Sequence, residues 1–331
     1  LNIDNLEQII SNQNINENEI NLKKINNIFD ESSIKSDKSY SSNNSDDSDN
    51  SDDGNYSDDS DNSEDSDYSD DSDYSDDGSC LMNETFVNIK NFPEVDYIIY
   101  CIKSNNIRTS NAYFNQFLRL VTSLKKKPKI LFTSSGAVYG VNDTKKKFLE
   151  DYNIDLKSID RFSGYKRAYA TEKLFLEKKF KKLADENFKV SIARCYTFIG
   201  KKILNQKYAI SDMLNNLQSN EVIKLNTKNQ VYRSYMYDED MVEWLIKIVK
   251  NSNNQCPIYN VGSNEEINLR KLIKILAKKF NKKYKLNKVI TKKIDYYVPV
   301  ITKAKKELNL NVKTKLMNAI NLTIRSTSEK N

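Results

Sequence analysis

Three side chains of this sequence have the types and the spacing that hydride and proton transfer at a carbinol require. Tyr169 and Lys173 lie four residues apart in a segment with helical periodicity (168–180), so they share one face of the predicted helix. A phenol titrates near ~10 in water, and a close ammonium lowers that pKa, which would make Tyr169 a general acid or base near neutral pH. Ser135 ends an apolar run, where its hydroxyl can bind the same reacting oxygen.

The spacing alone is weak evidence for a site. Tyr284 and Lys288 repeat it in a segment with no other sign of chemistry, and the chain contains 20 Tyr and 52 Lys and Arg. Taken alone, Tyr169 is equally well explained as a half-buried tyrosine on an ordinary helix. The segments around it must decide between the two.

Those segments alternate between strands and helices. KILFTSSGAVYG (129–140) is rich in β-branched and aromatic residues and ends in small ones, as a buried parallel strand does where it reaches a loop. VDYIIYCI (95–102) is predicted to be a central strand, and KVSIARCYTFIG (189–200) a buried strand that runs into a loop. Helices are predicted at 111–127 and 168–180, so the order is βαβ in character.

The order of the motifs resembles a known family. SSGAVYG followed by Tyr169-x-x-x-Lys173 is similar to the extended short-chain dehydrogenase/reductases, specifically the NAD-dependent nucleotide-sugar epimerases and dehydratases. An ordered series of motifs is far more specific than any single one. Four further segments match in the right order and extend the resemblance over about residues 90–325: IARCYTFIG, NQVYRSYMYDEDMVEW, YNVGSNEEINLRKL and YYVPVITKAKKELNL.

The resemblance implies an α/β fold. It would be a Rossmann-like, doubly wound parallel sheet, incomplete at its N-terminus, with a smaller C-terminal substrate lobe. The implied parts are a remnant of the second Rossmann strand and helix, an acidic insertion, a core with the catalytic Ser/Tyr/Lys set, and a substrate-binding lobe of which 229–262 returns to the core. Their bounds are 1–30, 31–84, 85–200 and 201–331.

The resemblance also implies roles for the catalytic residues. Tyr169 would be the acid/base, Lys173 would lower its pKa and hold the nicotinamide ribose, and Ser135 would share the reacting oxygen. Asn111 stands at the position of an asparagine that supports the lysine through a water molecule, with a helix cap or a surface residue as open alternatives. The implied cofactor is NAD, with NADP as the alternative.

Binding residues are implied at both ends of the chain. Thr197 matches a position that contacts the substrate diphosphate, and Arg233 matches one that contacts the diphosphate or the ribose, so the implied partner is a nucleotide-diphosphate sugar. A guanidinium suits this role because its planar fork matches phosphate oxygens, although a surface arginine in a strand is the alternative. Asp4 and Asn5 match an element that meets the adenosine ribose, and two residues of an Asn-rich tail are an equally open interpretation.

One feature of the family is missing from the sequence. Its glycine-rich turn, GxxGxxG, lets the backbone approach the cofactor pyrophosphate at a helix N-terminus, and none of the 7 glycines here are so spaced. The chain begins at Leu1 and its first methionine is Met82. We therefore expect either that the natural start lies upstream or that translation begins near Met82.

An acidic tract interrupts the resemblance. Residues 41–80 contain 16 Asp and Glu and no Lys or Arg, and nearly all the rest are Ser, Asn, Tyr and Gly, so we predict a disordered, low-complexity insertion in a surface loop. Its Ser-Asp-Asp steps would also suit an acid-directed serine kinase. The remaining chain is more basic than the net charge of +6, but its lysines form short clusters typical of solvated faces, so no nucleic-acid partner is predicted.

Composition excludes several other functions. The chain has no histidine, which rules out His-based triads and His-ligated metals, and its 4 cysteines show no paired spacing for zinc or disulfides. No apolar run approaches the ~20 residues of a membrane span, and no signal peptide is visible. We expect no metal, no membrane partner and a cytoplasmic location.

The loop after Ser135 indicates the reaction. Gly136 and Ala137 stand where dehydrating relatives carry an Asp-Glu pair, so a 4-epimerase is predicted, with a keto-reductase or a dehydratase of the same family as alternatives. A degenerate member that binds a nucleotide sugar or a protein without turnover is the third. A homodimer through the helices that contain Asn111 and Tyr169 is an expectation by resemblance.

Overall fold

The computed structural model describes residues 92–104, 106–205, 208–219, 221–289 and 293–328. The predicted remnant at 1–30, with Asp4 and Asn5, and the predicted insertion at 31–84 lie outside the described residues.

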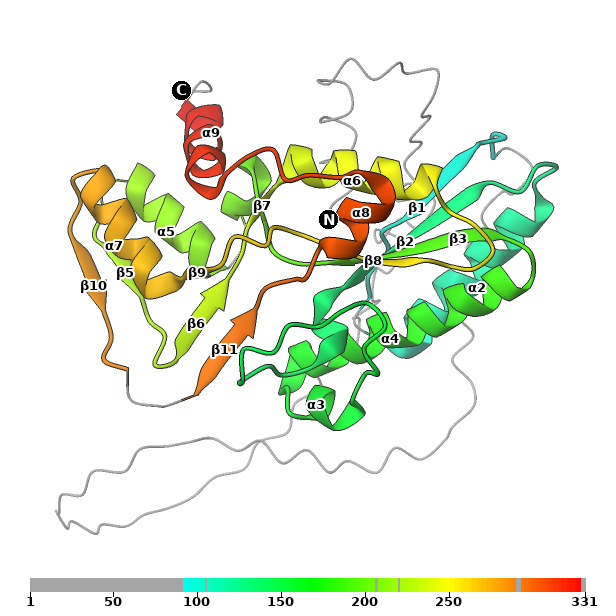
Figure 1. Ribbon diagram of the computed structural model, residues 1–331, viewed down its shortest axis with the longest axis horizontal. Coiled ribbons are helices and arrows are strands. Elements are labelled where there is room, and N and C mark those ends of the chain that lie inside the picture. The colour runs from blue at the N-terminus through cyan, green and yellow to red at the C-terminus, as the bar shows by residue number, and fades with distance from the viewer. Residues whose placement is uncertain (1–91, 105, 206–207, 220, 290–292, 329–331) are drawn as a thin grey trace, which may run out of the picture. The chain divides into compact units, whose positions relative to one another are not determined.

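A four-stranded parallel sheet forms the first layer of the fold (Figure 1). Its order is β1-β2-β3-β8, and all three neighbouring pairs are parallel. The register aligns Ser135 with Cys195 and Cys195 with Val261, so the carboxyl ends of three strands meet at one edge. The α/β prediction of a parallel Rossmann-like sheet is confirmed. The strands are β1 (Tyr97–Tyr100), β2 (Lys129–Ser135), β3 (Lys189–Cys195) and β8 (Ile258–Val261).

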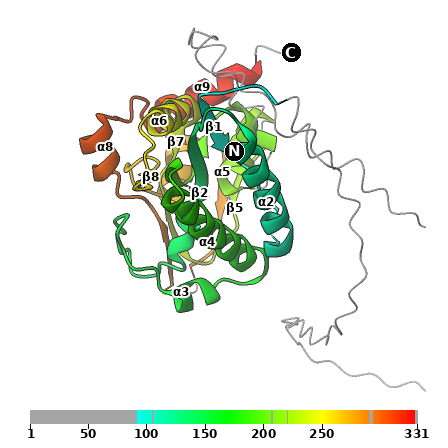
Figure 2. The same cartoon turned by 90° about the vertical axis from the view of Figure 1, so that its right-hand side faces the viewer.

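Helices cover both faces of this sheet, as Figure 2 shows from the side. On one face lie α2 (Ile107–Ser123) and α4 (Gly164–Asp185), and on the other α6 (Asp238–Lys250) and α8 (Thr302–Leu308). The bulky Tyr100 holds α2 and α4 against the sheet. Its ring packs edge-on against Phe117 and Phe180 at 5.0 and 5.1 Å, which ties β1 to α2 and α4.

The predicted helix bounds differ from the structure at α2 and α4. The helix expected at 111–127 runs from Ile107 to Ser123 because Asn106 caps it, accepting from the backbone N–H groups of Arg108 and Thr109. The helix expected at 168–180 is longer in both directions, with Ser163 at its N-cap position. Tyr169 therefore lies in the second turn of α4, inside a helix that is already established.

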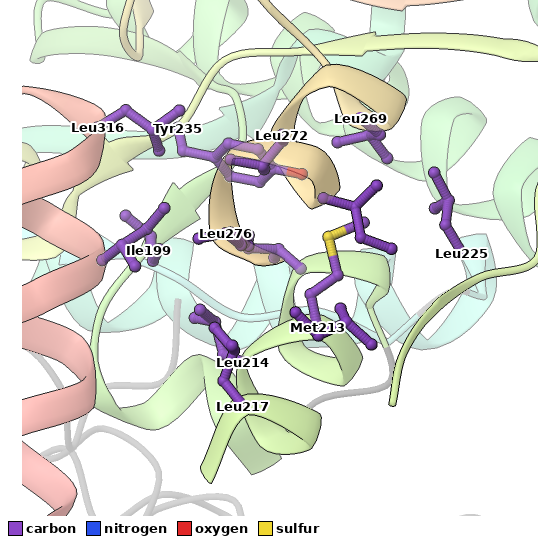
Figure 3. Close-up of a cluster of buried hydrophobic side chains, with 14 of the residues drawn as sticks. Ile199, Met213, Leu214, Leu217, Leu225, Tyr235, Leu269, Leu272, Leu276 and Leu316 are labelled. Carbon is purple, nitrogen blue, oxygen red and sulfur yellow. The ribbon is translucent and has the colours of Figure 1, made fainter. Parts of the chain in front are cut away.

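The C-terminal half builds a second hydrophobic core, shown in Figure 3. Met213 and Leu214 from α5 pack with Leu272 and Leu276 from α7, and Leu316 closes the cluster from α9. The elements around it are α5 (Ala209–Gln218), β5 (Ile223–Leu225), β6 (Gln230–Arg233), β9 (Ile267–Asn268), α7 (Leu269–Lys279), β10 (Tyr284–Leu286), β11 (Ile294–Tyr297) and α9 (Leu316–Ser328).

Two small sheets position this half. β5 pairs with β10 in parallel, and β6 lies between β11, which is parallel to it, and β9, which is antiparallel. The predicted domain bounds stay a prediction, although α6 and β8, both within 229–262, do pack on or in the four-stranded sheet. Short elements complete the described chain: η4 (Gly136–Tyr139), α3 (Leu156–Asp160), β4 (Phe198–Ile199), η5 (Lys201–Asn205) and β7 (Met236–Tyr237).

Where β4 and β7 end, Asp238 packs directly on a glycine. A Cβ at Gly200 would lie 1.7 Å from Asp238 Oδ2 and 2.1 Å from its Cγ, so no side chain fits there while Asp238 holds its place. Burial raises the pKa of Asp238 from 3.8 to about 6. The folded protein therefore binds a proton at Asp238 more tightly than the unfolded chain does.

This linkage predicts a pH dependence of stability. The contribution of Asp238 is fully present below pH 4 and is lost as the pH rises through about 6, which for a shift of this size amounts to about 3 kcal/mol. Asp238→Asn should abolish that part of the pH dependence, because the amide does not ionise. Urea unfolding of both proteins at pH 4.5 and 7.5 measures it. An equal pH dependence in the two proteins would contradict the prediction.

Among the residues that the structure describes, no helix combines the length and the hydropathy that crossing a bilayer requires.

Candidate functional site

The carboxyl end of β2 fixes the position of Ser135. Its Oγ accepts a hydrogen bond from the backbone N–H of Ala137 at 3.2 Å and so caps the short η4 helix. The neighbouring Ser134 Oγ donates to Glu177 Oε1 of α4 at 2.6 Å. Strand, cap and helix thus lock this corner of the sheet, and Ser135 is buried within it.

Helix α4 places Tyr169 and Lys173 beside this strand end. Lys173 Nζ lies 5.9 Å from the centre of the Tyr169 ring and 5.1 Å from that of Phe132 on β2. Lys173 is only 3% exposed, so this face of α4 is the one that packs on the sheet. The Ser135 hydroxyl also lies close enough to the Tyr169 phenol to lower its pKa. The structure brings the three predicted catalytic residues together.

The electrostatics of the pair differ from the prediction. Burial raises the pKa of Tyr169 well above its usual value, and the hydrogen bond with Ser135 offsets this only in part. Burial also lowers the pKa of Lys173. The expectation that Lys173 brings the pKa of Tyr169 towards neutrality is wrong for the structure as it stands, because a poorly solvated site disfavours both charged forms.

Asn111 lies inside α2 and not at its end, so the helix-cap alternative is wrong: the cap is Asn106. Within the described ranges, the Oδ1 atom of Asn111 is buried and has no hydrogen-bond partner. Buried acceptors of this kind are usually satisfied by ordered water. This fits the water-mediated support of Lys173 that the sequence predicted, which stays a prediction.

The two predicted diphosphate ligands already have partners within the protein. Thr197 Oγ1 donates to the carbonyl of Ser234. Arg233, on β6, forms a two-pronged ion pair with Asp295 of β11, with Nη1 3.0 Å from Oδ1 and Nη2 2.6 Å from Oδ2. The guanidinium of Arg233 is therefore held by the ion pair against β11, the strand that carries Asp295.

Tyr297 is a residue of the site that the sequence did not identify. Its Oη lies 3.3 Å from Ser135 Oγ and donates to the carbonyl of Cys195 at 3.4 Å. Its ring packs against Tyr196, with 4.5 Å between ring centres. The sequence motif that contains Tyr297 assigned it no role, because no local signal links it to a serine 162 residues earlier.

Tyr196 explains why a glycine follows Ser135. A Cβ at Gly136 would lie 2.5 Å from the Tyr196 ring, closer than any real contact. The ring fills the place that an acidic side chain at position 136 would need. The loop therefore has no room for the acid that dehydrating relatives carry there.

Gly136→Ala should destabilise the protein by about 1–3 kcal/mol, because the added methyl overpacks against Tyr196. Thermal or urea unfolding measures the change. Tyr196→Ala supplies the matched background, since removal of the ring should make Gly136→Ala nearly neutral. A full penalty in that background would show that the contact with Tyr196 is not its cause.

A dinucleotide would find part of its site among these residues. Lys173 Nζ donates to the carbonyl of Ile102 at 3.2 Å, and an ammonium has two further protons to offer to ribose hydroxyls. Together with Tyr169 and Ser135, this donor set fits the nicotinamide-ribose end of NAD. The pyrophosphate end has no glycine-rich turn in the sequence to receive it.

Other candidate sites lie elsewhere or are not formed. A cavity of about 700 Å³ opens beside α4 and β8, but none of the described candidate site residues lines it. It is bounded instead by Leu174, Lys178, Lys181, Cys256 and Ile258, among others. In the described part of the chain, no group of three or more His, Cys, Asp or Glu gathers as a metal site.

Comparison with known proteins identifies what this arrangement resembles. A family model described as "NAD dependent epimerase/dehydratase family" matches residues 80–262. A curated relative, dTDP-4-dehydro-6-deoxyglucose reductase of Escherichia coli, is 30% identical over 156 residues. That alignment covers 47% of this chain and 46% of the relative, so the match spans less than half the length of either protein.

Solved structures share the fold at low identity. The dTDP-glucose 4,6-dehydratase of Bacillus anthracis, in complex with NAD, has a TM-score of 0.57 and 17% identity, covering 71% of this chain and 73% of that one. The UDP-glucuronic acid 4-epimerase of Bacillus cereus, in complex with UDP-glucuronic acid and NAD, has a TM-score of 0.58 and 14% identity, covering 74% and 81%. These likenesses confirm the predicted fold class.

Proposed function

Because the chain belongs to the NAD-dependent epimerase/dehydratase family, we propose that it is a nucleotide-sugar 4-epimerase of that family. The observation that carries the proposal is the meeting of Ser135, Tyr169 and Lys173 at the carboxyl edge of the sheet. The loop after Ser135 supports an epimerase over a dehydratase, since Tyr196 fills the space that an acid at position 136 would occupy.

In the proposed reaction, Tyr169 accepts the proton of the sugar 4-hydroxyl and later returns it. When bound, NAD supplies a hydride acceptor and donor for the same carbon. Lys173 holds the ribose hydroxyls, and the Ser135 hydroxyl offsets part of the rise that burial causes in the pKa of Tyr169. Ser135 donates a hydrogen bond to the reacting oxygen, and its loss should cost about 2–4 kcal/mol of transition-state stabilisation if it acts as an oxyanion donor.

Thr197 and Arg233 are proposed to bind the substrate diphosphate. Arg233 offers the planar, two-pronged geometry that phosphate oxygens accept best. Both residues follow or end strands that lead to the same region as Ser135, because Tyr297 of β11 contacts Ser135 and pairs in register with Arg233 of β6. A nucleotide-diphosphate sugar would supply the phosphates to Arg233 and the hydroxyl to Ser135.

The experiment is a product analysis. The full-length protein is incubated with NAD and, in turn, with UDP-, dTDP-, GDP- and CDP-hexoses, and the products are separated and identified by NMR. The proposal predicts a C4 epimer from at least one of them without net consumption of NAD. A 4-keto-6-deoxy product, or no product from the whole panel, would contradict it.

A keto-reductase is the second candidate, favoured by the curated relative, which is a dTDP-4-dehydro-6-deoxyglucose reductase by name. A reductase needs no acid pair after Ser135, so Gly136 is compatible with it. The two are separated by stoichiometry, because a reductase consumes one NADH or NADPH for each keto-sugar and an epimerase consumes none. A homodimer through α2 and α4 and a cytoplasmic location complete the proposal.

A further inference from the structure

Strand β11 places two side chains against the two groups that are proposed to receive the substrate. Asp295 and Tyr297 lie two residues apart, so they project from the same face of the strand. β11 pairs in parallel with β6, and Tyr297 is in register with Arg233. One short strand thus reaches both Arg233 and Ser135.

At Arg233, the Asp295 carboxylate binds the guanidinium in the two-pronged way in which a phosphate would bind it. The two terminal nitrogens lie 3.0 and 2.6 Å from the two oxygens of Asp295, and Nη1 also donates to the Asp295 carbonyl at 3.0 Å. Burial raises the pKa of Asp295, but the ion pair with Arg233 outweighs it, so the pKa is lowered and the carboxylate stays charged. These are the donors that a diphosphate would need.

At Ser135, the Tyr297 hydroxyl occupies the position that a sugar hydroxyl is proposed to take. Tyr297 Oη lies 3.3 Å from Ser135 Oγ, and the carbonyl of Cys195 holds it there at 3.4 Å. The Arg233 guanidinium lies 6.0 Å from the centre of the same Tyr297 ring. The ring therefore stands between the two binding groups, and both are engaged by one strand.

We propose that Asp295 and Tyr297 are specificity-determining residues that occupy the binding groups when no substrate is bound. Asp295 takes the position of the substrate diphosphate on Arg233, and Tyr297 takes the position of a sugar hydroxyl on Ser135. This inference rests on the proposed function, because it takes Arg233 and Ser135 as the groups that bind a nucleotide-diphosphate sugar. A ligand must then replace both partners. A neutral sugar or a nucleoside lacks the charge to displace Asp295, whereas a nucleotide-diphosphate sugar brings both replacements.

The opposite role would be that Asp295 orients Arg233 for the substrate, as carboxylates often do for bound cations. The two roles differ in the sign of one measurement. If Asp295 competes with the diphosphate, its neutralisation strengthens nucleotide binding; if it orients Arg233, neutralisation weakens binding.

The first test is calorimetric titration of wild type and Asp295→Asn with UDP, GDP, CDP and dTDP, which needs no turnover. We expect the variant to bind its preferred nucleoside diphosphate about fivefold more tightly or better, the scale of a partly exposed ion pair. Asp96→Asn is the matched control. It removes the ion pair of Asp96 with Lys126 (2.5 Å), next to the amino end of β1, and should leave the affinity unchanged.

The second test separates the sugar from the nucleotide. Tyr297→Phe keeps the ring on Tyr196 but removes the hydroxyl on Ser135. It should leave the affinity for the nucleoside diphosphate unchanged and raise that for the nucleotide hexose about threefold or more, the scale of one hydrogen bond. Thermal unfolding of each variant verifies that it is folded.

The outcomes distinguish this inference from the proposed function. Binding by the wild type together with unchanged or weaker binding by Asp295→Asn overturns the inference and leaves the function standing. No binding of any nucleoside diphosphate by the wild type or the variant overturns both. Tighter binding by Asp295→Asn, with the sugar-dependent gain in Tyr297→Phe, is the result that the inference requires.

Discussion

Tyr169→Phe should reduce turnover by about 10²–10⁴-fold, the usual contribution of a positioned general acid or base. The ring is retained, so its parallel stacking on Tyr165 at 6.3 Å and the fold of α4 should persist. Only the hydroxyl that exchanges a proton with the sugar is lost. Steady-state rates are measured with the nucleotide hexose that the product analysis identifies.

Tyr165→Phe is the matched control, because Tyr165 lies one turn earlier on the same helix, is exposed and stacks on Tyr169. It should retain activity close to that of the wild type. If the turnover of Tyr169→Phe also stayed within about threefold of the wild-type value, Tyr169 would not be the acid/base and the proposed mechanism would be wrong.

The largest effect on stability is expected at the buried ion pair behind the site. Arg194 and Glu177 are 2% and 1% exposed, and Nη2 lies 2.8 Å from Oε2 while Nε lies 3.0 Å from Oε1. Glu177→Ala leaves the guanidinium of Arg194 buried without its counter-charge and should cost about 3–5 kcal/mol of unfolding free energy. It also removes the acceptor of the Ser134 hydroxyl.

Urea unfolding at neutral pH measures this cost. Lys126→Ala, which breaks the exposed pair with Asp96, should leave the midpoint nearly unchanged. Replacing both members of the buried pair, Glu177→Leu with Arg194→Met, should recover much of the loss, since no unpaired charge then remains. A single Glu177→Ala variant as stable as Lys126→Ala would contradict the assignment.

The parts of the fold that the sequence predicted are those encoded locally. The apolar run before Ser135 and the helical spacing of Tyr169 and Lys173 each lie within one element, so periodicity alone places them. The boundary of α2 was missed because one capping side chain, Asn106, starts the helix four residues earlier than the apolar pattern suggests.

The parts that were missed depend on segments distant in the chain. Tyr297 reaches Ser135 only because β11 pairs with β6, and the sequence of neither strand indicates that the other is its partner. Arg233 was predicted as a phosphate ligand, but its partner Asp295 follows from the same pairing. The pKa of Tyr169 was predicted in the wrong direction because burial, a property of the assembled fold, is the largest influence on it.

Gly136 shows how structure can change the meaning of a correct observation. The sequence indicated only that a glycine stands where dehydrating relatives carry an acid. The structure adds that Tyr196 occupies the space, so packing as well as residue type leaves no room for an acid at position 136. Both features of this position support the proposed choice of an epimerase over a dehydratase.

The fate of one hydrogen tests the account most directly. A nucleotide hexose carrying deuterium at C4 is incubated with the full-length protein and NAD, and the epimer is analysed by NMR and mass spectrometry. We predict that the deuterium remains at C4 of the epimer, because the hydrogen leaves and returns as a hydride within one closed site. Deuterium released to solvent, with protium at C4, would mean that the carbon is epimerised by proton abstraction, and would contradict the account.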